Sequence, residues 1–182
     1  MDEFISKDNV PTNMIDEVIL DFHKERVIVL NNLILDDILE NVILSILKWN
    51  KEDKNIPVEH RKPIWLYLQS PGGSSVIGFN LIDTITASET PVNTLCFAQC
   101  ASMGFLIFLA GHKRYAFPNS VLMMHEGQIT VINNASKAKD FMEFNDLSEE
   151  RCKNFVLSHS KITSDFYDEI YKKELYMYAN EK

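Results

Sequence analysis

The chain has 182 residues, of which 46% are hydrophobic, and this size suits one domain with a substantial core but not two domains of ordinary size. It carries 18 basic and 26 acidic side chains, for a net charge of −8. Because phosphate binding needs clustered lysine and arginine, this balance argues against a broad nucleic-acid surface.

The N-terminal part is mixed in character and includes Pro11 and scattered charges, so we expect a mobile or conditionally ordered segment over residues 1–24. Residues 25–182 are expected to form the single domain. Its first elements are a short β-branched strand at residues 26–30 and a helix that begins near Asp36, with leucine and isoleucine recurring on one face.

The middle of the chain alternates strands and helices. A strand at residues 64–68 leads into the loop Ser70-Pro71-Gly72-Gly73, and a helix with apolar residues four apart covers residues 77–85. A strand at 92–97 then precedes a nearly all-apolar helix at 101–109, which we expect to be buried.

Two further short strands are expected at residues 114–117 and 121–124. The alternation of strands and helices predicts repeated βαβ units around a mainly parallel sheet, which is an α/β fold. The rest of the chain favours helices: a long amphipathic one over residues 135–160, and a shorter one that begins at the capping pair Thr163-Ser164.

Three parts of the chain meet the needs of a serine hydrolase. A hydroxyl is a poor nucleophile until an imidazole takes its proton, and the oxyanion that forms on attack needs backbone N–H donors. Ser102 opens the buried helix, His125 ends an apolar strand, and Gly72-Gly73 follows another strand. Because the carboxyl ends of parallel strands share one crevice, we expect these loops to face one another. They would supply a nucleophile, a general base and an oxyanion hole made by the amides of Gly73 and Met103.

Each part also has a structural interpretation. The glycines could form only a tight turn, Ser102 could serve only as an N-cap, and a histidine at a strand end could be structural. Spacing alone does not identify the acidic third member of a triad. The other histidines are weaker candidates, because they fall in charged, turn or polar helical segments; they are His23, His60, His112 and His159.

Three cysteines, Cys96, Cys100 and Cys152, are an odd number without metal-ligand spacing. Apolar neighbours around two of them are typical of free buried thiols, which fits a reducing, cytoplasmic compartment. The chain begins without the pattern of a secretory signal and has no apolar run of about 18 residues. We therefore expect no membrane or nucleic-acid partner, no metal and no cofactor.

Five dispersed motifs occur in a specific order: Lys24-Glu25-Arg26-Val27-Ile28, Tyr67-Leu68-Gln69-Ser70-Pro71-Gly72-Gly73, Gln99-Cys100-Ala101-Ser102-Met103, Lys113-Arg114-Tyr115-Ala116-Phe117-Pro118-Asn119-Ser120 and Met124-His125. Together they resemble the ClpP family, the proteolytic subunits of ATP-dependent Clp proteases. The match runs from about residue 25 to the C-terminus. The resemblance implies the ClpP/crotonase-type fold, with Ser102 as nucleophile, His125 as general base, and the Gly73 and Met103 amides as oxyanion hole.

The resemblance also implies a third catalytic residue. Glu174 stands where the family has its catalytic Asp, although the extra methylene of Glu shifts the carboxylate. Another interpretation is that Glu174 is a solvated charge beside Lys172 and Lys173. The chain stops at Lys182, where the family continues with a helix and a strand, so the resemblance is to a divergent and C-terminally short member.

A helix–strand handle is implied as well, over about residues 126–160. Residues 129–131 and the long helix after them resemble the part of the family that joins two seven-membered rings into a barrel. We therefore expect these apolar positions to be buried between subunits.

The leading hypothesis is an ATP-dependent, Clp-type serine endopeptidase subunit that cleaves unfolded polypeptides into short peptides inside an oligomeric barrel. Its implied partners are the polypeptide substrates, a Clp-type AAA+ ATPase unfoldase, and further copies of the chain in stacked heptameric rings. One alternative is a catalytically weak, structural subunit of a mixed ring. Another is a crotonase-like acyl-CoA enzyme, which uses paired backbone donors but needs no Ser–His pair; Ser102 with His125 argues against it.

Overall fold

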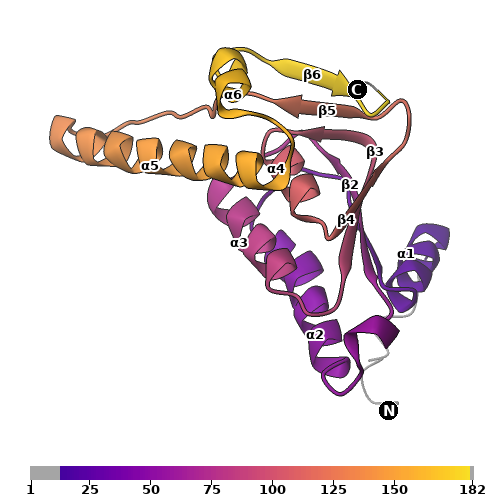
Figure 1. Cartoon of the computed structure of the whole chain (residues 1–182). Coiled ribbons are helices and arrows are strands. Elements are labelled where there is room, and N and C mark those ends of the chain that lie inside the picture. The colour runs from indigo at the N-terminus through magenta and orange to yellow at the C-terminus, as the bar shows by residue number, and fades with distance from the viewer. Residues whose placement is uncertain (1–12, 181–182) are drawn as a thin grey trace.

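A six-stranded sheet organises the chain, and the computed structural model describes residues 13–180 (Figure 1). The strand order is β1-β2-β3-β5-β6, and β4 pairs with the first half of β3. All pairs are parallel except β5 with β6. The strands are β1 (Val27–Leu30), β2 (Ile64–Ser70), β3 (Val92–Ala101), β4 (Lys113–Ala116), β5 (Val121–Met124) and β6 (Leu175–Tyr178).

The helices follow the strands closely in the order expected for βαβ units, so the α/β fold predicted from the sequence is confirmed. Two short helical turns add to them, a π-helical turn before α2 and a 3-10 turn before β2. The helices are α1 (Met14–Lys24), α2 (Leu44–Glu52, after the π turn Leu39–Ile43), α3 (Ser75–Thr86), α4 (Met103–Ala110), α5 (Ala135–His159) and α6 (Ser164–Ile170), and the 3-10 turn is Val58–His60.

The core lies between one face of the sheet and helices α2, α3 and α4. In β2 the side chains alternate, so that Ile64, Leu66 and Leu68 are fully buried towards these helices. Every residue of α4 is buried, as its continuous apolar sequence predicts. This packing holds the carboxyl ends of β2 and β3, where the candidate site lies.

The first helix was not predicted. In α1 the side chain of Asn13 caps the helix by accepting from the N–H groups of Ile15 and Asp16. The helix packs on the outer face of the sheet, where the Phe22 ring meets Tyr67 at 6.1 Å, and none of its residues is buried. The expected mobility of residues 1–12 lies outside the described residues, and the division of the chain at residue 24 stays a prediction.

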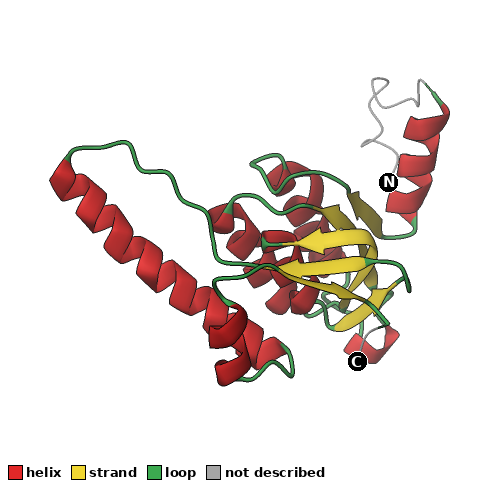
Figure 2. Cartoon of the chain, turned by 90° about the horizontal axis from the view of Figure 1, so that it is seen from above, coloured by secondary structure: helices red, strands yellow, loops and turns green. Residues whose placement is uncertain are grey.

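We call the loop 125–134 together with α5 the arm. Figure 2 shows α5 extending away from the sheet, with the loop running out to its far end. The long helix was predicted within one residue; residues 129–131, where the resemblance implies the strand of the handle, have no β pairing to any described residue. A strand requires a hydrogen-bonded neighbour, and the described chain offers none to this loop.

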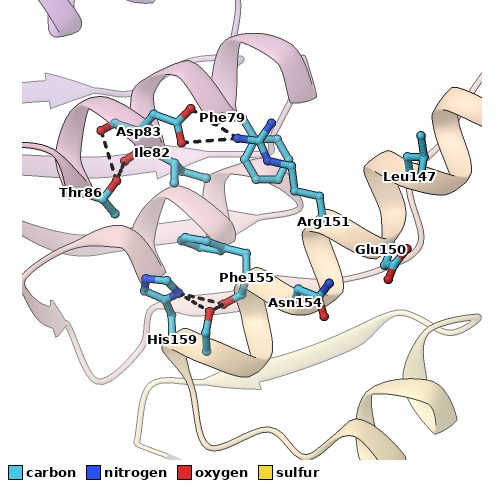
Figure 3. A pocket seen from close by; sticks show the side chains of 11 residues that line it. Phe79, Ile82, Asp83, Thr86, Leu147, Glu150, Arg151, Asn154, Phe155 and His159 are labelled. Carbon is cyan, nitrogen blue, oxygen red and sulfur yellow. Dashed lines mark hydrogen bonds and ion pairs between the residues drawn. The ribbon is translucent and has the colours of Figure 1, made fainter.

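The C-terminal half of α5 is fastened to α3 (Figure 3). The Arg151 guanidinium lies 4.2 Å from the centre of the Phe79 ring and forms an ion pair with Asp83 at 3.4 Å. Phe155 meets Phe79 edge-on and stacks on His159.

Between residues 13 and 180, no helix has the length and apolar character that a membrane crossing requires.

Candidate active site

Ser102 occupies a strained turn between β3 and α4. Its backbone has φ +53° and ψ −124°, a region that side-chain-bearing residues rarely adopt. The turn is held from both sides, because the Ser102 N–H donates to the Met123 carbonyl at 2.9 Å and the Ser102 carbonyl accepts from the N–H of Phe105. Within the described chain, the Ser102 hydroxyl makes no capping hydrogen bond to α4, so the N-cap interpretation does not account for it.

Gly73, the second glycine of the loop after β2, lies between two backbone hydrogen bonds to Ile34. The Ile34 N–H donates to the Gly72 carbonyl and the Ser74 N–H donates to the Ile34 carbonyl, both at 2.9 Å. In such a parallel bridge the N–H of the intervening residue, Gly73, points away from Ile34 and is not used by the bridge. A Cβ atom at Gly73, whose φ is +147°, would lie 2.5 Å from the Ile34 oxygen, so only glycine fits here.

The first glycine packs against the serine. A Cβ atom on Gly72, whose φ is +105°, would lie 2.7 Å from the Cβ atom of Ser102. The Gly72 N–H donates to the Ser70 hydroxyl at 3.1 Å, which fixes the loop in this position. The two loops therefore face one another, as the positions of their strands predicted.

A cavity of about 400 Å³ brings four of the predicted residues together: Gly73, Ser102, Met103 and His125. The Met103 N–H is in the first turn of α4, where helical N–H groups have no partner within the helix. His125 directly follows β5 and is partly exposed. Within residues 13–180, no hydrogen bond joins the Ser102 hydroxyl to the imidazole; such contacts often tighten only when substrate binds.

Glu174 directly precedes β6. The antiparallel register pairs Met124 with Leu175, so one further step places His125 opposite Glu174. Opposite residues of an antiparallel pair present their side chains on the same face. Glu174 is exposed and accepts a hydrogen bond from the Tyr176 hydroxyl at 3.0 Å, which raises the pKa of that hydroxyl. In the described part of the chain, no hydrogen bond joins Glu174 to His125.

The arm supplies the rest of the cavity wall, which the sequence analysis missed. Residues of α5 and of the loop 125–134 line it. From the sequence, the apolar face of α5 was expected to contact other subunits. An apolar face looks the same in the sequence whether it lines a cavity or meets another subunit, so the cavity wall was not predicted. The contributing α5 residues are Phe141, Phe144, Asn145, Ser148, Glu149, Cys152 and Val156.

The four weaker histidine candidates do not line this cavity. His23 lies within 3.2 Å of the Ser45 hydroxyl, and burial lowers its pKa. The His112 ring contacts the backbone of Val92. All three cysteines are free, with Cys96 and Cys100 buried.

Comparisons with known proteins show which family this chain resembles. A family model described as Clp protease matches residues 11–182. The ATP-dependent Clp protease proteolytic subunit 1 of Bacillus cereus (strain ATCC 10987 / NRS 248) is 37% identical over 122 residues. That alignment covers 63% of this chain and 60% of the relative, so the matched part spans about three fifths of the relative's length.

Proposed function

Because the chain belongs to the Clp protease family, we propose that it is a serine endopeptidase subunit that cleaves unfolded polypeptides into short peptides. One observation carries the proposal: a single cavity is lined by Ser102, His125, Gly73 and Met103. These residues come from three different loops at the carboxyl ends of β2, β3 and β5. The proposal gives each of them one role in acyl transfer.

Catalysis would begin at Ser102. His125 takes the hydroxyl proton while the Ser102 oxygen attacks the carbonyl carbon of the scissile peptide bond. The negative charge on the carbonyl oxygen is met by the N–H groups of Gly73 and Met103, and the N-terminus of α4 adds to this stabilisation. The protonated imidazole then gives its proton to the leaving amine, and an acyl group stays on Ser102. Water, deprotonated by His125, releases the acid and restores the hydroxyl.

Glu174 is the proposed acid of the triad, with an imperfect position. Its place opposite His125 in the register supports the assignment. Its exposure and its hydrogen bond to Tyr176 support a weak hold on the imidazole. We therefore propose that the isolated chain has low basal activity. The same two observations favour the second candidate function, a catalytically weak structural subunit of a mixed ring.

The partners belong to the same proposal. The relative's name, an ATP-dependent proteolytic subunit, supports a Clp-type AAA+ ATPase unfoldase that delivers polypeptide in the cytoplasm. Further copies of the chain, in stacked heptameric rings, would cover the apolar side chains that the arm exposes. These include Ile132, which is 93% exposed, and Phe144 and Leu147 on α5.

The experiment that tests this function is labelling with a fluorophosphonate probe, which reacts with activated serines, together with hydrolysis of a fluorogenic peptide. Ser102→Ala should abolish both while leaving the fold intact. Ser148→Ala is the matched control, because Ser148 lines the same cavity from α5 and its hydroxyl donates to the Phe144 carbonyl. Labelling that survives in Ser102→Ala would reject the assignment.

A further inference from the structure

One carboxylate faces the cavity that contains Ser102. Glu149, on α5, lines this cavity and accepts a hydrogen bond from the Tyr171 hydroxyl at 2.8 Å through Oε2. Its Oε1 atom lies against Gly127, where an added Cβ would come within 2.3 Å. The carboxylate is therefore held between α5 and the segment that directly follows His125.

The negative charge of Glu149 is not cancelled within the described chain, because none of the ion pairs there includes it. The neighbouring cations on α5 are engaged elsewhere: Arg151 points to Asp83 on α3 (Figure 3), and Lys153 pairs with Asp168 on α6. Burial, and then the charge of Glu149, raise the pKa of the Cys152 thiol to about 11.

The other walls of the cavity combine apolar and aromatic side chains with uncharged polar ones, among them Ser74, Gln128 and Asn145. Leu106 of α4 and Val156 of α5 are buried there, and Phe141 and Phe144 stand on the arm side. Among the described residues that line the cavity there is no lysine or arginine. A volume of about 400 Å³ accommodates one long side chain. A cavity with apolar side chains, uncharged polar groups and one carboxylate can hold a side chain with an apolar stem and a cationic head, which is the construction of lysine and arginine.

We propose that Glu149 determines specificity, so that the enzyme cleaves after lysine or arginine. The inference rests on the proposed function and names its substrate class. The residue whose carbonyl Ser102 attacks would extend its side chain along the apolar walls, and its ammonium or guanidinium group would pair with the Glu149 carboxylate. Its carbonyl would remain between Ser102 and the two donor amides.

The test uses two fluorogenic peptides that differ only in having lysine or leucine before the scissile bond. The parent should favour the lysine peptide in kcat/KM. In Glu149→Gln the lysine-to-leucine ratio should fall about tenfold or more, because an amide keeps an acceptor for Tyr171 but loses the charge. Glu150→Gln is the matched control, since Glu150 is the next residue on α5 and lines a different pocket, between α3 and α5 (Figure 3). A ratio that is unchanged in Glu149→Gln would overturn the proposal.

A binding measurement separates this inference from the proposed function. Fluorescence anisotropy of the two peptides with Ser102→Ala needs no hydrolysis. Tighter binding of the lysine peptide, lost in Ser102→Ala/Glu149→Gln, would support the role of Glu149 even if the parent hydrolyses neither peptide. Equal binding of both peptides to Ser102→Ala would overturn it, whatever the parent hydrolyses.

Discussion

The sheet and the arm differ in how completely they bury their apolar side chains. In the sheet region, Ile64, Leu66 and Leu68 are fully buried, and every residue of α4 is buried. The 25-residue helix α5 buries only Val156, while Phe144 is 58% exposed. The proposed nucleophile, Ser102, therefore lies in a part of the molecule whose core is filled by the chain's own residues. The cavity wall formed by α5 lies in a part that leaves most of its apolar side chains exposed.

This difference predicts different responses to substitution. Changes at the sheet end of the cavity should act on chemistry or on folding. Changes in the arm should act on assembly and on substrate choice.

The largest expected effect is at His125, where the sheet meets the arm. His125→Ala should lower kcat by a factor on the order of 10⁴ or more, because the Ser102 hydroxyl loses its proton acceptor. The free energy of unfolding should change little, because His125 is partly exposed beyond the end of β5. Peptide hydrolysis and urea unfolding measure the two quantities. His60→Ala, at an exposed histidine outside the cavity, is the control. A kcat within about tenfold of the parent would place the general base elsewhere.

The second test asks how strongly the sheet region depends on one buried charge. Asp53, 2% exposed, accepts two hydrogen bonds from Arg26 at 2.6 and 2.8 Å and one from Thr90 at 2.9 Å. Asp53→Asn should cost about 3 kcal/mol of unfolding free energy, because Arg26 loses its buried carboxylate partner and keeps only the longer ion pair with Glu52 and the hydrogen bond to the Lys62 carbonyl. Asp168→Asn, which breaks the exposed pair with Lys153, should cost at most about 1 kcal/mol.

The ion pair between Arg26 and Asp53 also makes the free energy of unfolding depend on pH. The hydrogen bonds from Arg26 hold the folded-state pKa of Asp53 below its usual value. The contribution of Asp53 to the free energy of unfolding is therefore complete above its unfolded-state pKa of about 3.9. It is lost as the pH falls through the lower pKa that Asp53 has in the folded state. The stability gap between the parent and Asp53→Asn should shrink below about pH 4 in urea titrations. A gap that is constant with pH would contradict the role of this ion pair.

The elements predictable from the sequence are those whose apolar pattern is satisfied inside the chain. The strands β2 and β3 and the buried helix α4 belong to this class. Their alternating or continuous apolar residues can be buried in only one way within the core, so the sequence pattern identifies the element. The meeting of Gly73, Ser102 and His125 was predictable for a related reason: parallel strands end at the same edge of a sheet.

The unpredicted features lack such a constraint. Helix α1 buries no residue, so its pattern carried no core signal. Strand β6 has four residues and is defined by its pairing with β5 rather than by its own sequence. For α5, the pattern identified an apolar face but not what the face meets, so the position of Glu149 in the cavity was missed.

A third test addresses the arm directly. Ile132 is 93% exposed in the loop 125–134, so Ile132→Asp should weaken assembly about tenfold if copies of the chain cover this loop. Light scattering over a range of concentrations measures the change in mass. Asn133→Asp adds the same charge at an exposed polar neighbour and should leave the mass unchanged. The same mass for Ile132→Asp as for the parent would show that subunits do not meet at this loop.

The smallest expected effect is at Glu174, which directly precedes β6 and is not among the residues that line the cavity. An exposed charged contact is worth about 0.2–1 kcal/mol, which corresponds to at most about fivefold in rate. Glu174→Gln should therefore lower kcat by no more than this. Glu174→Asp should retain or raise activity, since it restores the shorter carboxylate of the family. Glu169→Gln, at an exposed residue of α6 that pairs with Lys173, is the control.

Rates of Glu174→Gln and Glu174→Asp that both equal the rate of the parent would make Glu174 a surface charge only. A loss on the order of 10⁴ in Glu174→Gln would instead mean that the carboxylate fully orients His125 during turnover, and that the chain is an efficient peptidase without further support.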